Sequence, residues 1–249
     1  MLVASATAQL GRALLLAGFL AAFFGAFAAA VGARRNDPKT LRFVPQFVVI
    51  ATAMAVAVFA VMEWAMITRD FSLLYVQKVG SRSTPALYNF AAVWSALEGS
   101  ILMWLLILAG YVAAAMWWMR KRLAEPLVGW AMAVMLAVLA YFFLLSFGPA
   151  NPFVVGPPGI VDGPGPNPLL QNHLLVMFHP PILYLGYVGM TVPFAFAIAA
   201  LLAGKVEDGW LHLTRRWTVA AWGFRPPLVR RLRLKMARFS KATWPIIRC

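Results

Sequence analysis

The segment that decides the fold reads Met177-Phe178-His179-Pro180-Pro181-Ile182-Leu183-Tyr184-Leu185-Gly186-Tyr187. It follows a loop rich in glycine, proline and asparagine, and it opens a long apolar run. Proline is tolerated in the first turn of a helix, where its missing N–H would have no partner. The pattern therefore predicts a membrane helix that begins at Pro180, with His179 held at the boundary between membrane and water. A titratable, metal-binding side chain at such a boundary is a candidate functional group.

The composition predicts a membrane protein. Of the 249 residues, 62% are hydrophobic and 12% are charged, whereas soluble chains carry roughly a quarter charged residues. The net charge is +14, but most of the excess lies in short clusters between apolar runs, where positive residues orient a protein in the lipid bilayer. The charge therefore does not indicate nucleic-acid binding. The single cysteine, Cys249, cannot form an internal disulfide.

Five apolar runs are long enough to cross a bilayer of about 30 Å. We therefore expect an all-α fold, a multi-pass transmembrane helical bundle over residues 1–224 with five to six spans. The expected spans are residues 10–31, 43–67, 91–118, 127–147 and 180–202, with a possible sixth beginning at 217.

The distribution of positive charge predicts the orientation. Basic links stay in the cytoplasm, so the N-terminus, the segment 69–85 and the loop 148–172 are expected outside. His179 would then lie at the outer face. The basic clusters that carry this prediction are Arg34, Arg35, Lys39 and Arg42, then Arg120, Lys121 and Arg122, then Lys205, Arg215 and Arg216.

Two segments do not fit the pattern of spans. Residues 69–85 are too polar for lipid and too apolar for a free linker, which predicts an interfacial strand-like or short helical segment. The tail, residues 225–249, contains no Asp or Glu. It fits either a basic amphipathic helix on an anionic membrane surface or an unstructured basic tail. The apolar face of that helix would carry Leu228, Leu232, Met236 and Phe239.

His179 is the strongest candidate ligand. Neutral imidazole binds haem iron, and an axial ligand must be held rigidly, which two following prolines favour. The alternative is a helix-boundary histidine whose ring is satisfied by a backbone carbonyl. His173, in the preceding loop, is the second candidate, whereas His212 is expected to be solvated on the cytoplasmic side.

Two acidic residues lie in apolar runs. Glu98 falls inside the expected third span, and a carboxylate at membrane depth marks a functional site. The alternatives are a shallow position that reaches water, or a protonated carboxyl bonded to Ser100 or to a backbone carbonyl. Glu63 is nearer to its interface, which favours a structural role. Trp94 is a possible functional residue beside Glu98, although aromatic belts and packing explain such tryptophans equally well.

Several sequence blocks carry a resemblance to a known family. Asn167-Pro168-Leu169-Leu170-Gln171-Asn172 with the His179-Pro180-Pro181 segment resembles the signature of the CcmF family of membrane haem lyases. Asp70-Phe71-Ser72 and Glu98-Gly99-Ser100 match two more motifs of this family in the right order. The resemblance covers about residues 43–224 and ends with Arg215-Arg216-Trp217-Thr218 and Ala221-Trp222-Gly223-Phe224.

The resemblance implies a role in cytochrome c maturation, in a bacterial inner membrane. It implies that His179 is an axial ligand to haem b at the periplasmic face, with Pro180, Pro181 and Tyr184 in supporting positions, and it assigns no catalytic residue. Members of this family receive haem from a haem chaperone and attach it through thioethers to an apocytochrome c. These proteins and other maturation subunits are therefore the implied partners.

The chain departs from the family in two places. Ala96-Leu97 stands where members often have Gly-His, so the resemblance implies no ligand there. After Phe224, Arg225-Pro226-Pro227 replaces a helix, and the family's second outer histidine and intramembrane ligands lie beyond this point. We expect a truncation, a shifted reading frame or a natural split subunit with a companion chain. Such a chain would not ligate haem with two histidines or form thioethers alone. The alternatives are a non-catalytic assembly scaffold and a proton-coupled transporter that uses Glu98.

Overall fold

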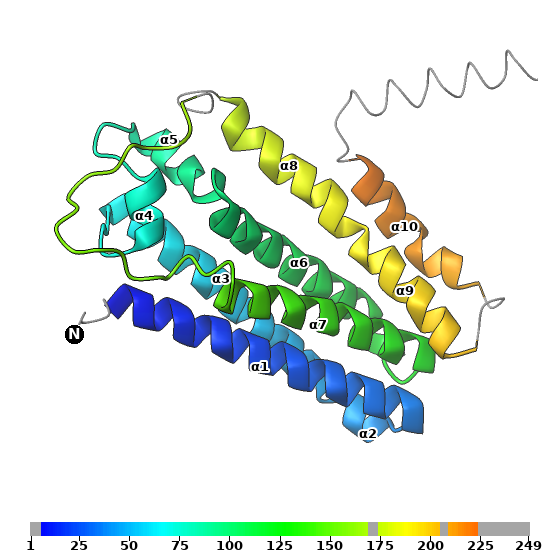
Figure 1. Cartoon of the computed structure of the whole chain (residues 1–249). Coiled ribbons are helices and arrows are strands. Elements are labelled where there is room, and N and C mark those ends of the chain that lie inside the picture. Colours follow the sequence, from blue (N-terminus) through cyan, green and yellow to red (C-terminus); the bar gives the residue numbers. More distant parts are fainter. Residues whose placement is uncertain (1–5, 169–173, 205–208, 224–249) are drawn as a thin grey trace, which may run out of the picture.

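The computed structural model describes residues 6–168, 174–204 and 209–223, and in these ranges the chain is almost entirely helical (Figure 1). Within these ranges, five segments are long and apolar enough to cross a membrane. This confirms the expected multi-pass all-α membrane fold. The spans are α1 (Ala6–Arg35), α3 (Val44–Thr68), α6 (Leu97–Met119), α7 (Pro126–Phe147) and the consecutive helices α8 (Leu175–Gly189) and α9 (Thr191–Leu202).

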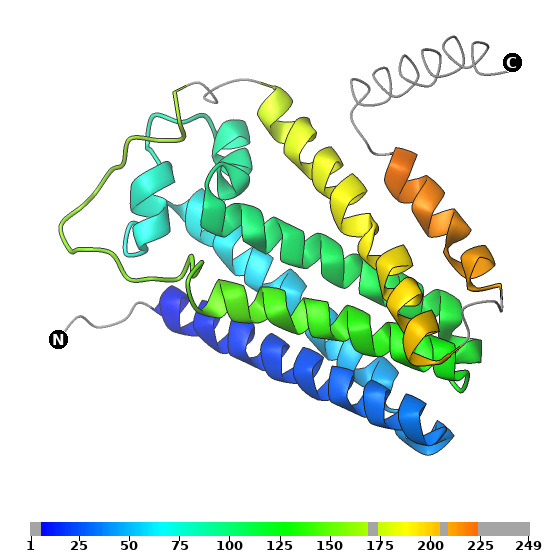
Figure 2. The ribbon, with the colours of Figure 1, turned by 45° about the vertical axis from the view of Figure 1, so that its right-hand side comes forward.

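The helices run side by side in an antiparallel bundle. Helix α1 packs on α3 and α7, and α6 packs on α3, α7 and α8. A further helix, α10 (Trp210–Gly223), covers α8 and α9 on the side away from α1 (Figure 2). The short helices α4 (Leu74–Val79), α5 (Ala86–Ala91) and η1 (Ala92–Trp94) gather at the end where α8 begins. At the opposite end lie α2 (Pro38–Leu41) and η2 (Arg120–Arg122).

A seven-residue repeat of glycine lets α1 approach its neighbours closely. A Cβ at Gly18 would lie 2.2 Å from the Phe143 ring, and one at Gly11 would lie 2.3 Å from the Phe153 ring. Residues seven apart share one helix face, and small residues on such a face allow close packing of membrane helices. Gly25 and Gly32 continue the same face against Phe47 and Leu41.

The third span begins at Leu97, not at residue 91 as expected. The preceding residues form α5 and η1, and Ala96 has an extended backbone. Two serine hydroxyls donate hydrogen bonds to backbone carbonyl oxygens at this break. Ser95 Oγ donates to Ala92 O at 2.8 Å, and Ser100 Oγ donates to Trp94 O at 3.0 Å. Such side-chain bonds compete with the helical pattern, and so the apolar run does not form one continuous helix.

The fifth span begins at Leu175, earlier than the expected start at residue 180. Pro180 and Pro181 therefore lie inside α8, as its sixth and seventh residues, and His179 is already helical. Because Pro180 has no N–H, the carbonyl of Val176 loses its helical partner. The indole of Trp94 donates to this carbonyl at 2.8 Å, which allows the helix to continue through the prolines.

The helix at the position of the possible sixth span, α10, begins earlier than expected, at Trp210 instead of residue 217, and is not among the candidate membrane spans of the described residues. Arg215 and Arg216 thus belong to a helix and not to a link. The inner face of α10 packs on the bundle, because the Trp217 ring lies 6.2 Å from the Tyr111 ring and Ala221 is fully buried.

The segment 69–85 contains α4 and is tied to the loop after α7. Leu74 N donates to Val154 O at 2.8 Å, and Gln77 Nε2 donates to Pro157 O at 2.9 Å. The Thr7 hydroxyl donates to Asp70 at 2.8 Å and joins the start of α1 to this segment. The two alternatives for the tail, residues 225–249, fall outside the described residues.

Candidate functional site

His179 is exposed on the first part of α8, at the end of the bundle that carries α4 and α5. Within the described ranges its ring makes no hydrogen bond, so these residues supply no carbonyl of the kind a purely structural histidine would use. The side chains that share its helix face, Leu175, Phe178 and Ile182, are apolar and exposed. The imidazole is therefore presented beside an apolar strip.

Trp94 fixes the helix turn that carries His179. Its side chain is only 6% exposed, it packs edge-on against Phe90 with ring centroids 5.3 Å apart, and its indole N–H bonds Val176 O. Val176 lies three residues before His179. Trp94 thus positions His179 indirectly, through the backbone of α8. Its indole N–H is used in the hydrogen bond to Val176 O.

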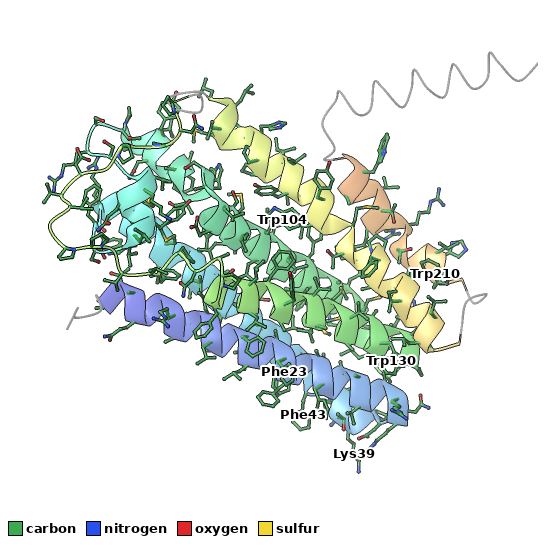
Figure 3. All side chains as sticks on the ribbon, viewed as in Figure 1. Phe23, Lys39, Phe43, Trp104, Trp130 and Trp210 are labelled. Carbon is green, nitrogen blue, oxygen red and sulfur yellow. The ribbon has the colours of Figure 1, made fainter. Side chains whose placement is uncertain are left out.

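Tyr184 anchors the next part of α8 against the bundle. Its ring lies 5.5 Å from the ring of Trp104, which in turn stacks on Phe142 at 5.7 Å. Figure 3 shows Trp104 between α6 and α8. Further along, the Tyr111 hydroxyl donates to Leu185 O at 2.8 Å. Aromatic packing and the hydrogen bonds from Trp94 and Tyr111 hold α8 against the bundle, while the His179 side chain remains exposed on the bundle surface.

Glu98 lies in the first turn of α6, where its side chain is 26% exposed and 3.8 Å from Lys78 Nζ. The carboxylate therefore lies beside a cation and is partly exposed. A carboxylate in the first turn of a helix is also favoured by the helix dipole.

Glu63 is the acidic residue that sequence reasoning undervalued. It is 8% exposed, and within the described part of the chain neither carboxylate oxygen has a hydrogen-bond partner. Its level in the bundle follows from the antiparallel pairing of α3 and α6. The Thr52 hydroxyl donates to Ala109 O at 3.4 Å, which places these two residues at the same level. Eleven residues later on α3 comes Glu63, and eleven residues earlier on α6 comes Glu98, so these two residues are also at one level. Counting residues from the interface could not show that this side chain faces inward.

Tyr75 completes the polar interior at this end. Its hydroxyl donates to Val93 O at 2.7 Å, and burial raises the pKa of its phenol. It remains a hydrogen-bond donor and links α4 to η1, directly before Trp94. The position of Trp94 therefore depends on a buried hydrogen bond as well as on its own packing.

The other histidines do not join His179 among the described residues. His173 lies outside the described ranges, and His212 is exposed on α10 at the opposite end of the bundle. No group of three or more His, Cys, Asp or Glu side chains able to hold a metal ion occurs in the described part of the chain. The described residues thus offer a single imidazole at this end, which could supply one axial ligand.

These features define a multi-span helical membrane protein that presents a histidine at one end of its bundle. The family model described as "Cytochrome C assembly protein" matches residues 94–248. The match covers more than half of the chain, which therefore belongs to this family.

Individual relatives support the same assignment. The cytochrome c-type biogenesis protein CcmF of Pseudomonas aeruginosa is 38% identical over 222 residues, which are 87% of this chain and 33% of the relative. CcmF of Escherichia coli K12 is 37% identical over 194 residues, or 78% of this chain and 30% of the relative. The solved structure of the cytochrome c haem lyase CcmF superposes with a TM-score of 0.77 at 32% identity, over 90% of this chain and 35% of that one. The resemblance to CcmF is confirmed, and the chain spans about a third of the length of these relatives.

Proposed function

We propose that this chain serves cytochrome c maturation as the N-terminal part of a membrane haem lyase, in which His179 is an axial ligand to haem held as substrate. The relatives' names support cytochrome c biogenesis and haem lyase activity. The observation that carries the proposal is the exposed imidazole, without a hydrogen bond to any described residue, on a helix turn fixed by Trp94.

The surroundings of His179 fit one side of a haem. Imidazole nitrogen is a good axial ligand for haem iron, and the exposed apolar residues Leu175, Phe178 and Ile182 offer contact for an apolar ring system. His212 cannot be the opposite ligand, because the helical rise from His179 to Leu202 through α8 and α9 separates the two ends by about 35 Å at 1.5 Å per residue. The proposed second ligand therefore comes from outside the described residues, for example from a companion chain.

The proposed orientation places His179 on the periplasmic side of a bacterial inner membrane. The ends of α1 and α6 carry Arg34, Arg35 and Arg120 to Arg122, and the bundle brings both clusters to the end away from His179. Positive clusters favour the cytoplasmic side. On this assignment the N-terminus, α4 and α5 lie outside, where an apocytochrome c and a haem chaperone would reach the histidine. The acceptor cysteines would belong to the apocytochrome.

The test measures haem b binding to the purified full chain by absorption spectroscopy. We expect one haem with histidine ligation, its loss in His179→Gly, and its recovery when free imidazole is added to that variant, because imidazole replaces the missing side chain. His212→Gly is the control, since it removes an exposed histidine at the opposite end of the bundle and keeps the proposed ligand. Loss of haem in His173→Gly with full binding in His179→Gly would overturn the assignment. Stoichiometric bis-histidine haem on this chain alone would contradict the need for a second ligand from elsewhere.

A further inference from the structure

A cleft of about 410 Å³ lies between α10 and the final turn of α6, at the end of the bundle opposite His179. His212, Arg216 and Ala220 are four residues apart and form one face of α10 on this cleft. Trp118 closes the other side, and Leu213 and Trp217 complete the lining. Figure 3 shows Trp130 and Trp210 at the same end of the bundle.

The cleft combines a cation with aromatic surface. The guanidinium carbon of Arg216 lies 5.1 Å from the centre of the Trp118 ring, and Trp217 is fixed by its contact with Tyr111. Trp118 is 56% exposed although it lies at the end of a membrane span. Tryptophan at such a position lies at the level of the lipid head groups. The cleft therefore opens where a head group meets its acyl chains.

The charges around the cleft leave Arg216 available to a ligand. Arg122 is bound by Glu125 through two hydrogen bonds of 2.6 and 2.8 Å, and the Arg120 guanidinium lies 3.9 Å above the Trp117 ring. Among the described residues, Glu125 is the one acidic residue that lines the adjoining hollow, which shares His212 and Leu213 with the cleft. Within the described ranges Arg216 has no acidic partner.

We propose that this cleft binds the phosphate head group of an anionic phospholipid, independently of the haem function. Arg216 and His212 contact the phosphate, and Trp118 with Leu213 and Trp217 contacts the glycerol and the first part of the acyl chains. Basic pockets between membrane helices on the positively charged side bind such head groups. Arg215 is exposed on the same helix but does not line the cleft, so it provides a matched control.

Native mass spectrometry of the full chain tests the proposal. The full chain is used because Glu207 and Asp208 are acidic and lie outside the described residues, so every sample must contain them. Phosphatidylglycerol is titrated against phosphatidylcholine of the same acyl chains. We expect one phosphatidylglycerol to be retained preferentially, and Arg216→Gln to weaken it about tenfold, because a charge-assisted hydrogen bond to phosphate is lost. Trp118→Leu is expected to weaken it less, and Arg215→Gln to leave it unchanged.

Three results would overturn the proposal. Equal retention of the two lipids would show that the head-group charge is not recognised. Equal losses in Arg215→Gln and Arg216→Gln would show unspecific attraction to a basic helix. Displacement of the lipid by inorganic phosphate alone would show a general anion site in place of a lipid site. Each outcome leaves the haem spectrum of His179 untouched, so the two proposals fail separately.

Discussion

Replacing Gly99 by alanine is expected to be among the most damaging small changes in this chain. A Cβ at this position would lie 1.6 Å from Val93 O and 2.5 Å from the Tyr75 hydroxyl. Ordinary contact begins near 3.4 Å, so the Val93 carbonyl would have to move by about 1.8 Å, the difference between 3.4 and 1.6 Å. Val93 is a backbone neighbour of Trp94, and the displacement therefore reaches the contact that fixes α8.

The magnitude follows from two losses. Overpacking a rigid site costs about 1–3 kcal/mol. Moving the carbonyl also breaks the 2.7 Å hydrogen bond from Tyr75, and an unpaired buried donor costs about 1–3 kcal/mol. We expect Gly99→Ala to lower the free energy of unfolding by about 2–6 kcal/mol on these terms, and to weaken haem binding through the displaced Trp94.

Gly110 in the same helix provides the control. A Cβ there meets no atom within 4 Å, and alanine is favoured over glycine inside a helix by about 1 kcal/mol. Gly110→Ala should therefore be neutral or slightly stabilising. Thermal unfolding in detergent, followed by the fluorescence of the 10 tryptophans, compares the two variants. Equal stability of Gly99→Ala, Gly110→Ala and the unaltered chain would refute the reasoning.

Three other changes test separate parts of the structure. Trp94→Phe keeps most of the packing on Phe90 but removes the donor to Val176 O, so we expect a loss of about 1–3 kcal/mol and weaker haem binding; an unchanged haem affinity would show that this bond does not position His179. Glu63→Met replaces a buried, unpartnered carboxyl by an apolar side chain and should raise stability by about 1–3 kcal/mol; a less stable variant would reveal a partner for Glu63 outside the described residues. Burial alone would raise the pKa of Asp70, but hydrogen bonds from Ser72 and Thr7 outweigh it and lower this pKa below the usual 3.8. The ionised Asp70 carboxylate therefore stabilises the fold above pH 3.8, and this stabilisation is lost as the pH falls through the lowered pKa. Asp70→Asn should therefore be less stable at neutral pH and lose less stability on acidification, and parallel pH curves for the two proteins would count against this role.

Length and hydropathy were enough to predict the membrane bundle, because apolar runs of about 20 residues have few other stable structures. The glycine repeat from Gly11 to Gly32 was not predicted, because its importance depends on the rings of Phe143 and Phe153, which approach it only in the folded bundle. The residues at which helices begin were harder to predict from the sequence. The start of α6 depends on where the hydroxyls of Ser95 and Ser100 bond, and that choice is made in the folded structure.

The burial of Glu63 shows a second limit. Its distance along the chain from the interface is short, which favoured a shallow position that reaches water, yet Glu63 is only 8% exposed and its carboxylate has no hydrogen-bond partner among the described residues. The rotation of a nearly uniform apolar helix is set by packing against its neighbours and not by its own pattern. The polar interior that Glu63 shares with Tyr75 could therefore be found only from the three-dimensional arrangement.

The placement of His179 is likewise a property of the whole bundle. Two consecutive prolines inside a helix remove two backbone hydrogen bonds, and a proline in a helix interior costs about 3 kcal/mol or more. The cost is reduced here because the prolines follow soon after the helix start, and because the indole of Trp94, 82 residues before Val176 in the sequence, supplies one of the missing donors. The prolines thus make the histidine turn dependent on η1, and through Val93 on Tyr75 and Gly99. A side chain held in this way keeps its direction only while the end of α3 and the starts of α6 and α8 stay together. Changes at Gly99 or Trp94 should therefore alter the proposed haem binding without touching the imidazole.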